Sequence, residues 1–237
     1  MKKALVIQHV ASEGLGNLEP VLIKSGYEIN FIRLWLDDFS KFDPIKPDLM
    51  VVLGGPIGVY NRDKFPLLDK EINFIKMRTK FKNLPTLGIC LGSQIIAHTL
   101  GANIYPGQNG FELGYHQLTN LDGSSLFSNL NQNELKVLHW HGDTFDLPPG
   151  TKRYASSKQY INQAYATENF KIMGLQFHLE VAPTEFEGWL ISNAPELLSD
   201  PQINIAELRS DNLKYGIPLQ EFAIKFWTTW INQINKG

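Results

Sequence analysis

The chain has a single cysteine, Cys90, and its surroundings are suited to nucleophilic chemistry. A buried strand is predicted at 85–89 and a helix at 93–100, with Gly88 and Gly92 two residues to either side of the cysteine. This pattern is typical of a nucleophile elbow, in which glycine avoids the crowding that a Cβ would cause. The helix N-terminus favours thiolate over thiol. Cys90 is therefore a candidate nucleophile, and the alternative is a small apolar residue packed in the core.

A cysteine nucleophile needs a base, and the base needs a group that orients it. His178 follows an apolar run at 172–177, and active sites of α/β sheets collect at strand ends. Glu180 comes two residues later, so an extended backbone places both side chains on one face. We expect Glu180 to hold one ring nitrogen while the other faces Cys90. Alone, a His-x-Glu pair is weak evidence, because such pairs are common on protein surfaces.

Backbone amides near Cys90 could stabilise an oxyanion. Gly54 and Gly55 follow a predicted strand at 49–53, and their amides carry no side chain that would block them. The amide of Leu91 is expected to point toward the sulfur of Cys90. A plain glycine turn is the alternative interpretation of the Gly54-Gly55 pair.

Strand and helix patterns predict the fold that positions these groups. The first half alternates apolar strands with helices, which indicates a parallel sheet covered on both faces; the strands are expected at 3–10, 27–35, 49–53 and 85–89, and the helices at 15–25, 67–78 and 93–100. Short strands in the second half predict antiparallel additions to the sheet, at 113–118, 136–140, 153–156, 163–166 and 171–177. We predict a doubly wound, flavodoxin-like α/β fold with a mixed sheet, and an active site at the carboxyl ends of its central strands.

The C-terminal part reads as helical, with 219–234 the longest candidate helix. We predict one domain over residues 1–237, with a motif-bearing core at 3–180 and a helical extension at 183–237. Aromatic residues recur at helical spacing in this extension, namely Phe222, Phe226, Trp227 and Trp230. Such a stripe favours core packing over a partner surface.

Composition limits the classes of partner. Hydrophobic residues make up 43% and charged residues 19%, and the net charge is -2, so neither a nucleic acid nor a membrane surface is expected. One cysteine excludes an internal disulfide, and no stretch approaches the ~20 apolar residues of a membrane span. We expect a cytoplasmic protein; its oligomeric state stays open.

Three motifs resemble, in this order, the signature of class I (triad-type) glutamine amidotransferases. They are Gly54-Gly55-Pro56, Gly-Ile-Cys-Leu-Gly-Ser-Gln at 88–94 and Gln-Phe-His-Leu-Glu at 176–180. The resemblance runs over residues 3–180. The segments 139–143 and 162–164 look most like the branch related to the amidotransferase domain of GMP synthase.

The resemblance implies the reaction. Cys90 would attack the glutamine amide carbon, His178 would move the proton from the thiol to the departing ammonia, and Glu180 would orient His178. The amides of Gly55 and Leu91 would form the oxyanion hole. A γ-glutamyl thioester would then be hydrolysed, with no metal or organic cofactor.

The resemblance also implies where glutamine binds. Gln94 matches a position that helps to hold its amino-acid end. His141, Gly142 and Asp143 match the loop that lines the same pocket, and Asp143 would face the α-amino group. Neither of two common ATP-binding loops is found, so ammonia would pass to a separate synthetase chain or acceptor.

Three other interpretations remain open. A relative with the same nucleophile could cleave a γ-glutamyl peptide, and the room beyond the leaving group would decide. A non-catalytic interaction module is disfavoured by the intact triad. Half of a zinc motif could be formed by His139, His141 and Asp143, although a polar strand end lining a pocket explains these residues better.

Overall fold

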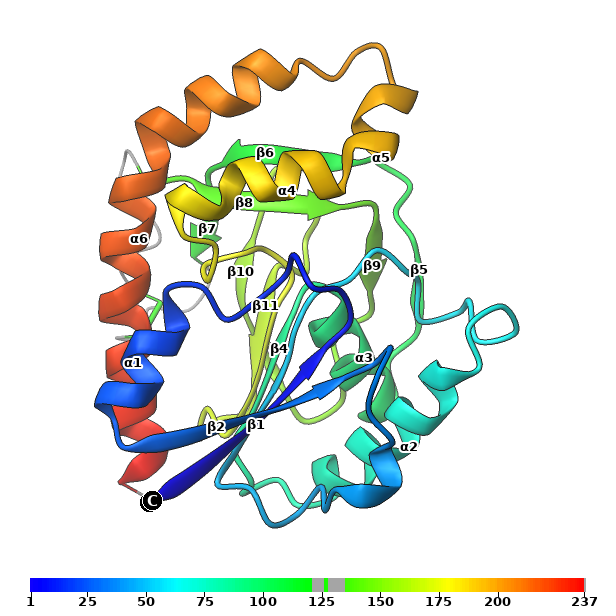
Figure 1. Cartoon of the computed structure of the whole chain (residues 1–237), viewed down its shortest axis with the longest axis vertical. Helices are drawn as coiled ribbons and strands as arrows, with labels where there is room; N and C mark the ends of the chain where they lie inside the picture. Colours follow the sequence, from blue (N-terminus) through cyan, green and yellow to red (C-terminus); the bar gives the residue numbers. More distant parts are fainter. Residues whose placement is uncertain (121–125, 128–134, 237) are drawn as a thin grey trace.

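The computed structural model describes residues 1–120, 126–127 and 135–236 (Figure 1). Its main sheet has the strand order β2-β1-β3-β4-β12-β11-β10-β7. Five strands are parallel: β1 (Lys2–Gln8), β2 (Tyr27–Arg33), β3 (Leu49–Val52), β4 (Thr86–Ile89) and β12 (Ile172–Leu175). The antiparallel strands are β11 (Ala164–Ala166), β10 (Lys152–Ser156) and β7 (Thr119–Asn120).

The order of the five parallel strands is that of the flavodoxin-like doubly wound fold. Every residue of β3, β4 and β12 is buried, as expected for parallel strands that are covered on both faces. The predicted fold class is therefore confirmed. In such a sheet the carboxyl ends of the central strands meet at one edge, where ligands bind.

Two hydrophobic clusters cover the two faces of the sheet. Alternate residues of β1 separate between them: Ala4 and Val6 belong to one cluster, and Leu5 and Ile7 to the other. Helices α1 (Leu18–Lys24) and α6 (Ile205–Asn235) pack in the first cluster, and helices α2 (Leu67–Thr79) and α3 (Leu91–Thr99) in the second (Figure 1).

Helix α6 is longer than the predicted 219–234. It begins at Ile205 and continues through Pro218. Asn204 caps its N-terminus, because the Asn204 side chain accepts a hydrogen bond from the Glu207 N–H. The predicted helix leaves out residues 205–218, because this stretch contains many polar residues and ends in a proline. The aromatic stripe is confirmed as core, because Phe226, Trp227 and Trp230 are buried and Phe222 is partly buried.

One part of the strand prediction is wrong. The strands expected at 113–118 and 136–140 form a separate ladder of β6 (Glu112–His116) with β8 (Val137–His141), and do not extend the main sheet. A further ladder, absent from the prediction, joins β5 (Ile104–Pro106) to β9 (Asp143–Phe145). Alternation of side chains identifies a strand but not its partner.

The remaining elements are short. They are the 3₁₀ helices η1 (Phe39–Lys41) and η3 (Pro183–Glu185) and the helices α4 (Phe186–Ser192) and α5 (Ala194–Ser199). In the described part of the chain, no helix has both the length and the apolar character needed to cross a membrane.

Candidate active site

Cys90 lies at the turn between β4 and α3 in a strained backbone conformation. Its φ is 50° and its ψ is -110°, which side chains rarely adopt. A Cβ on Gly88 would lie 2.5 Å from the backbone of Gly92, and a Cβ on Gly92 would lie 2.0 Å from the carbonyl oxygen of Val52. The predicted elbow is therefore confirmed in its geometry, and both glycines are required by close backbone approach.

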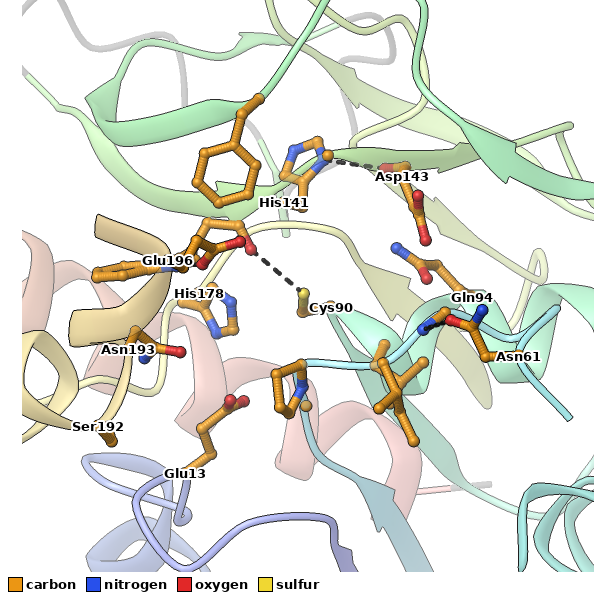
Figure 2. A pocket seen from close by; sticks show the side chains of 18 of the residues that line it. Glu13, Asn61, Cys90, Gln94, His141, Asp143, His178, Ser192, Asn193 and Glu196 are labelled. Atoms are coloured by element: carbon orange, nitrogen blue, oxygen red, sulfur yellow. Dashed lines mark hydrogen bonds between the residues drawn. The ribbon is translucent and has the colours of Figure 1, made fainter. Parts of the chain in front are cut away.

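His178 and Glu180 lie beside the elbow, on the segment after β12. Strand β12 ends at Leu175, earlier than expected, and the His178 N–H is held by the carbonyl of Leu138 at 2.8 Å. The Nδ1–H of His178 donates to Glu180 Oε1 at 2.6 Å. Nε2 of His178 is thus left for Cys90, the neighbour that Figure 2 shows beside it.

Burial and the neighbouring imidazole act in opposite directions on the pKa of the Cys90 thiol. Burial raises the pKa of Cys90, while His178 acts in the opposite direction; Sγ lies 3.7 Å from the carbonyl oxygen of Trp140. Burial acts against the thiolate that the helix N-terminus is expected to favour, so the thiolate stays a prediction. Burial would also lower the pKa of His178, but the carboxylate of Glu180 raises it well above its ordinary value.

A pocket of about 530 Å³ opens over Cys90. Eight of the nine predicted site residues border it, namely Gly55, Cys90, Leu91, Gln94, His141, Gly142, Asp143 and His178. Glu180 lies behind His178 and is 2% exposed. Sequence reasoning therefore identified residues that the fold brings together from four separate segments.

Gln94 and Asp143 lie on the same side of Cys90 (Figure 2). Gln94 donates from Nε2 to Gln176 Oε1 at 3.0 Å, and Asp143 accepts from the Tyr60 hydroxyl at 3.0 Å. Burial raises the pKa of Asp143, with Tyr60 opposing the shift. A cationic group that entered this end of the pocket would favour the ionised carboxylate.

His141 lies between the backbone of Asp143 and the side chain of Glu112. Its Nδ1–H donates to the backbone carbonyl of Asp143 at 3.0 Å, and its Nε2 lies 3.1 Å from Glu112 Oε2. The hydrogen bond to the Asp143 carbonyl fixes the backbone there, so His141 both borders the pocket and holds the loop that presents Asp143.

Glu112, His139 and His141 are the described residues whose ligand atoms could hold a metal ion. The zinc motif considered from the sequence used Asp143, which instead binds Tyr60, while Glu112 takes its place near the two histidines. Glu112 Oε2 already accepts from Gln163 Nε2 at 2.6 Å. Burial would raise the pKa of Glu112, but His141 and His139 lower it to about 2. Glu112 and His141 thus form a buried support for the pocket loop at residues 141–143. Among the described residues, neither ring nitrogen of the buried His139 has a hydrogen-bond partner, and its Nδ1 lies 3.3 Å from Glu112 Oε2.

Several pocket residues were missed by the sequence analysis. Glu13 is 7% exposed, and burial raises the pKa of its carboxyl group, which His178 opposes. Trp189, Asn193 and Glu196 come from α4, α5 and the residue that joins them. The Trp189 ring lies 4.7 Å from the His178 ring, and Glu196 accepts from Trp140 Nε1 at 3.0 Å. No motif marks these residues, and Trp189, Asn193 and Glu196 lie beyond the segment that resembles the amidotransferases.

Comparisons with known proteins agree with this site. Residues 14–195 match the family model of class I glutamine amidotransferase. The GMP synthase [glutamine-hydrolyzing] of Campylobacter hominis is 30% identical over 74% of this chain and 34% of its own length. The corresponding enzyme of Streptococcus mutans is 36% identical over 70% of this chain and 30% of its own length. The chain therefore spans about a third of the length of these relatives.

A solved structure matches over nearly the whole chain. A glutamine amidotransferase from Thermotoga maritima has a TM-score of 0.83 and 31% identity, and the match covers 97% of this chain and 98% of that one. A glutamine amidotransferase from Methylobacillus flagellatus, at 22% identity, shares the fold with a TM-score of 0.81. With the elbow, the histidine and the carboxylate in place, the chain belongs to the class I glutamine amidotransferases.

Proposed function

We propose that this protein hydrolyses the side-chain amide of glutamine and releases ammonia. The observation that carries the proposal is the Cys90 elbow beside the His178–Glu180 pair, at the bottom of a pocket that extends to Gln94 and Asp143. A nucleophile, an oriented base and a lined pocket are the parts that acyl transfer needs.

The thiol of Cys90 attacks the amide carbon after His178 Nε2 takes its proton. The negative charge that develops on the amide oxygen is stabilised by the N–H groups of Gly55 and Leu91. His178 then returns the proton to the nitrogen as ammonia departs, leaving a γ-glutamyl thioester. Water attacks the thioester with His178 again as the base, which restores the thiol and yields glutamate.

The amino-acid end of glutamine binds on the side of Gln94 and Asp143. The α-ammonium group pairs with the Asp143 carboxylate, and the Gln94 amide contacts the backbone end of the substrate. His141 and Gly142 hold the loop that presents Asp143.

The ammonia passes to a separate acceptor or synthetase chain. The relatives named above are glutamine-hydrolysing GMP synthases more than twice as long as this chain, and this chain matches only about a third of each. We place the protein in the cytoplasm, without a nucleic-acid or membrane partner. Residues 183–237 belong to the same domain as the core, since α6 shares one hydrophobic cluster with β1, β3 and β4.

A second substrate is favoured by the extent of the pocket. It continues past Cys90 to Asn193 and Glu196, on the side opposite Gln94 and Asp143 (Figure 2). Ammonia is too small to need this space, whereas the amine of a γ-glutamyl peptide would fill it.

Ammonia release from glutamine by the purified chain tests the first proposal, and amino-acid release from γ-glutamyl peptides tests the second. Turnover of glutamine that disappears in Cys90→Ser supports an amidotransferase glutaminase. Faster turnover of the peptides makes the second substrate the main one. Failure on all substrates, together with no alkylation of Cys90 by a glutamine-like chloroketone, contradicts both proposals and favours a non-catalytic module.

A further inference from the structure

The loop at residues 54–58 follows β3 and supplies the Gly55 N–H of the proposed oxyanion hole; we call it the oxyanion loop. Two buried side chains that take no part in the mechanism above lie next to it. His9 directly follows β1, and Glu71 lies in α2; their side chains are 1% and 0% exposed. His9 Nδ1 lies 2.8 Å from the carbonyl oxygen of Gly54, and His9 Nε2 lies 2.9 Å from Glu71 Oε1. A buried pair of this kind is expensive to maintain unless it has a structural or functional purpose.

The chemistry of the partners fixes the direction of the first hydrogen bond. A carbonyl oxygen only accepts, so His9 Nδ1 must carry a hydrogen and donate it to Gly54. Burial lowers the pKa of His9, but the charge of Glu71 and the bond to it raise the pKa above the ordinary value. Glu71 thus supports an imidazole that donates from both ring nitrogens.

The bond to Gly54 also determines where the next amide points. The Gly54 carbonyl and the Gly55 N–H belong to one planar trans peptide, and their bonds point in opposite directions; no cis peptide occurs among the described residues. A carbonyl held toward His9 therefore directs the Gly55 N–H away from His9. Gly55 borders the pocket, and within the described part of the chain its N–H has no acceptor.

We propose that His9, anchored by Glu71, is a positioning residue that keeps the Gly55 N–H directed into the oxyanion hole. Glycine at 54, 55 and 58 leaves this loop free to adopt a second arrangement. If the peptide between Gly54 and Gly55 turned over, a carbonyl oxygen would replace the N–H and repel the oxyanion. The packing is close as well, because a Cβ on Gly55 would lie 2.8 Å from His9 Cβ.

Two substitutions at His9 separate the hydrogen bond from the packing. His9→Phe removes the donor and keeps a ring, whereas His9→Asn places an amide nitrogen where Nδ1 was. Both leave Glu71 without its partner, so they differ mainly in the bond to Gly54. Loss of one oxyanion donor lowers kcat by about 10²–10³-fold. We expect His9→Phe to lose about 100-fold in kcat, with KM changed by less than about threefold, and we expect His9→Asn to recover most of the activity.

A second measurement, the rate of Cys90 alkylation, reports on the nucleophile without the oxyanion hole. Alkylation of Cys90 by iodoacetamide forms no oxyanion, so its rate should be the same in His9→Phe as in the wild type. Arg78→Lys is the matched control: Arg78 lies on the same helix as Glu71, is fully buried and binds the carbonyls of Pro44 and Pro85. It should lower stability and leave kcat unchanged.

The kcat measurement rests on the proposed hydrolysis, whereas a crystal structure tests the role of His9 without it. Crystal structures of the wild type and His9→Phe should differ in the orientation of the peptide between Gly54 and Gly55. An unchanged orientation, or an equal loss of kcat in His9→Phe and His9→Asn, would overturn the proposal.

An inactive wild type would contradict the proposed function, and the two crystal structures would still decide the role of His9. If His9→Phe does not fold, Glu71→Leu replaces it, with about a tenfold loss of kcat expected; wild-type kcat in that variant would also overturn the proposal.

Discussion

The two sides of the pocket are built in different ways. The side that holds Cys90 comes from short connections after parallel strands, where close backbone approach demands glycine at 88 and 92. The side that holds Asn193 and Glu196 comes from the short helices α4 and α5, with no comparable backbone constraint. The first side is therefore expected to determine whether the chemistry occurs, and the second to determine which leaving group is accepted.

The largest effect is expected from Gly88→Ala. The new Cβ would meet the backbone of Gly92 at 2.5 Å, which no side-chain motion can relieve. We expect the free energy of unfolding to fall by about 3 kcal/mol, near the upper end for overpacked sites, and turnover of glutamine to be lost. Urea unfolding and ammonia release measure the two effects.

Gly188→Ala is the matched control for this substitution. Gly188 lies in α4, and a Cβ there would meet nothing within 4 Å. Alanine in a helix is favoured over glycine by about 0.5–1 kcal/mol, so this variant should be slightly more stable. Equal losses in the two variants would remove the distinction between the two sides.

A smaller effect is expected from Glu180→Gln. Both Cys90 and His178 have raised pKa values in the free site, and Glu180 contributes to both shifts. The pair must lose one proton to become reactive, so kcat/KM should rise with increasing pH. A neutral glutamine no longer supports the imidazolium, and the acidic limb should therefore move to lower pH.

We also expect Glu180→Gln to reduce kcat by about 10²-fold, within the range of acid–base contributions. The pH dependence of kcat/KM for the wild type and the variant measures the shift. A movement of the acidic limb to higher pH would contradict the role given to Glu180.

Substitutions at the two ends of the pocket should change KM in different ways. Asp143→Asn removes the charge proposed to meet the α-ammonium group, and hydrogen bonds to charged groups are worth about 1.5–3 kcal/mol. KM for both glutamine and γ-glutamyl peptides should rise by roughly tenfold or more. Asn193→Ala should change KM for glutamine by less than about twofold and weaken the peptides only. Equal effects of Asn193→Ala on both substrates would show that this side does not select the leaving group.

The smallest effect is expected from removal of metals. Glu112 accepts from Gln163 at 2.6 Å and lies beside His141, so its carboxylate has partners without a metal ion. Dialysis against a chelator should leave kcat unchanged. Activity lost on dialysis and restored by Zn²⁺ would assign the cluster to metal binding.

The difference between local backbone constraints and contacts of distant segments also explains what could be predicted from the sequence. The positions of the parallel strands and the elbow follow from local patterns, since apolar runs and glycines at 88 and 92 report on the backbone around them. The pairing of β6 with β8 and the contact between His9 and Glu71, 62 residues apart, depend on how distant segments pack. No spacing in a single sequence records such contacts.

The burial of Cys90 could not be predicted for the same reason. The helix N-terminus after Cys90 is visible in the sequence and favours a thiolate. Burial by β8 and the segment around His178 is not visible there, and it raises the pKa of the thiol.

Intact-mass analysis after acid quenching tests the central claim most directly. The wild type mixed with glutamine should gain the mass of one γ-glutamyl group, located on the peptide that contains Cys90, and Cys90→Ser should show neither the adduct nor ammonia release. Ammonia release that continues in Cys90→Ser, or an adduct on another residue, would contradict the account.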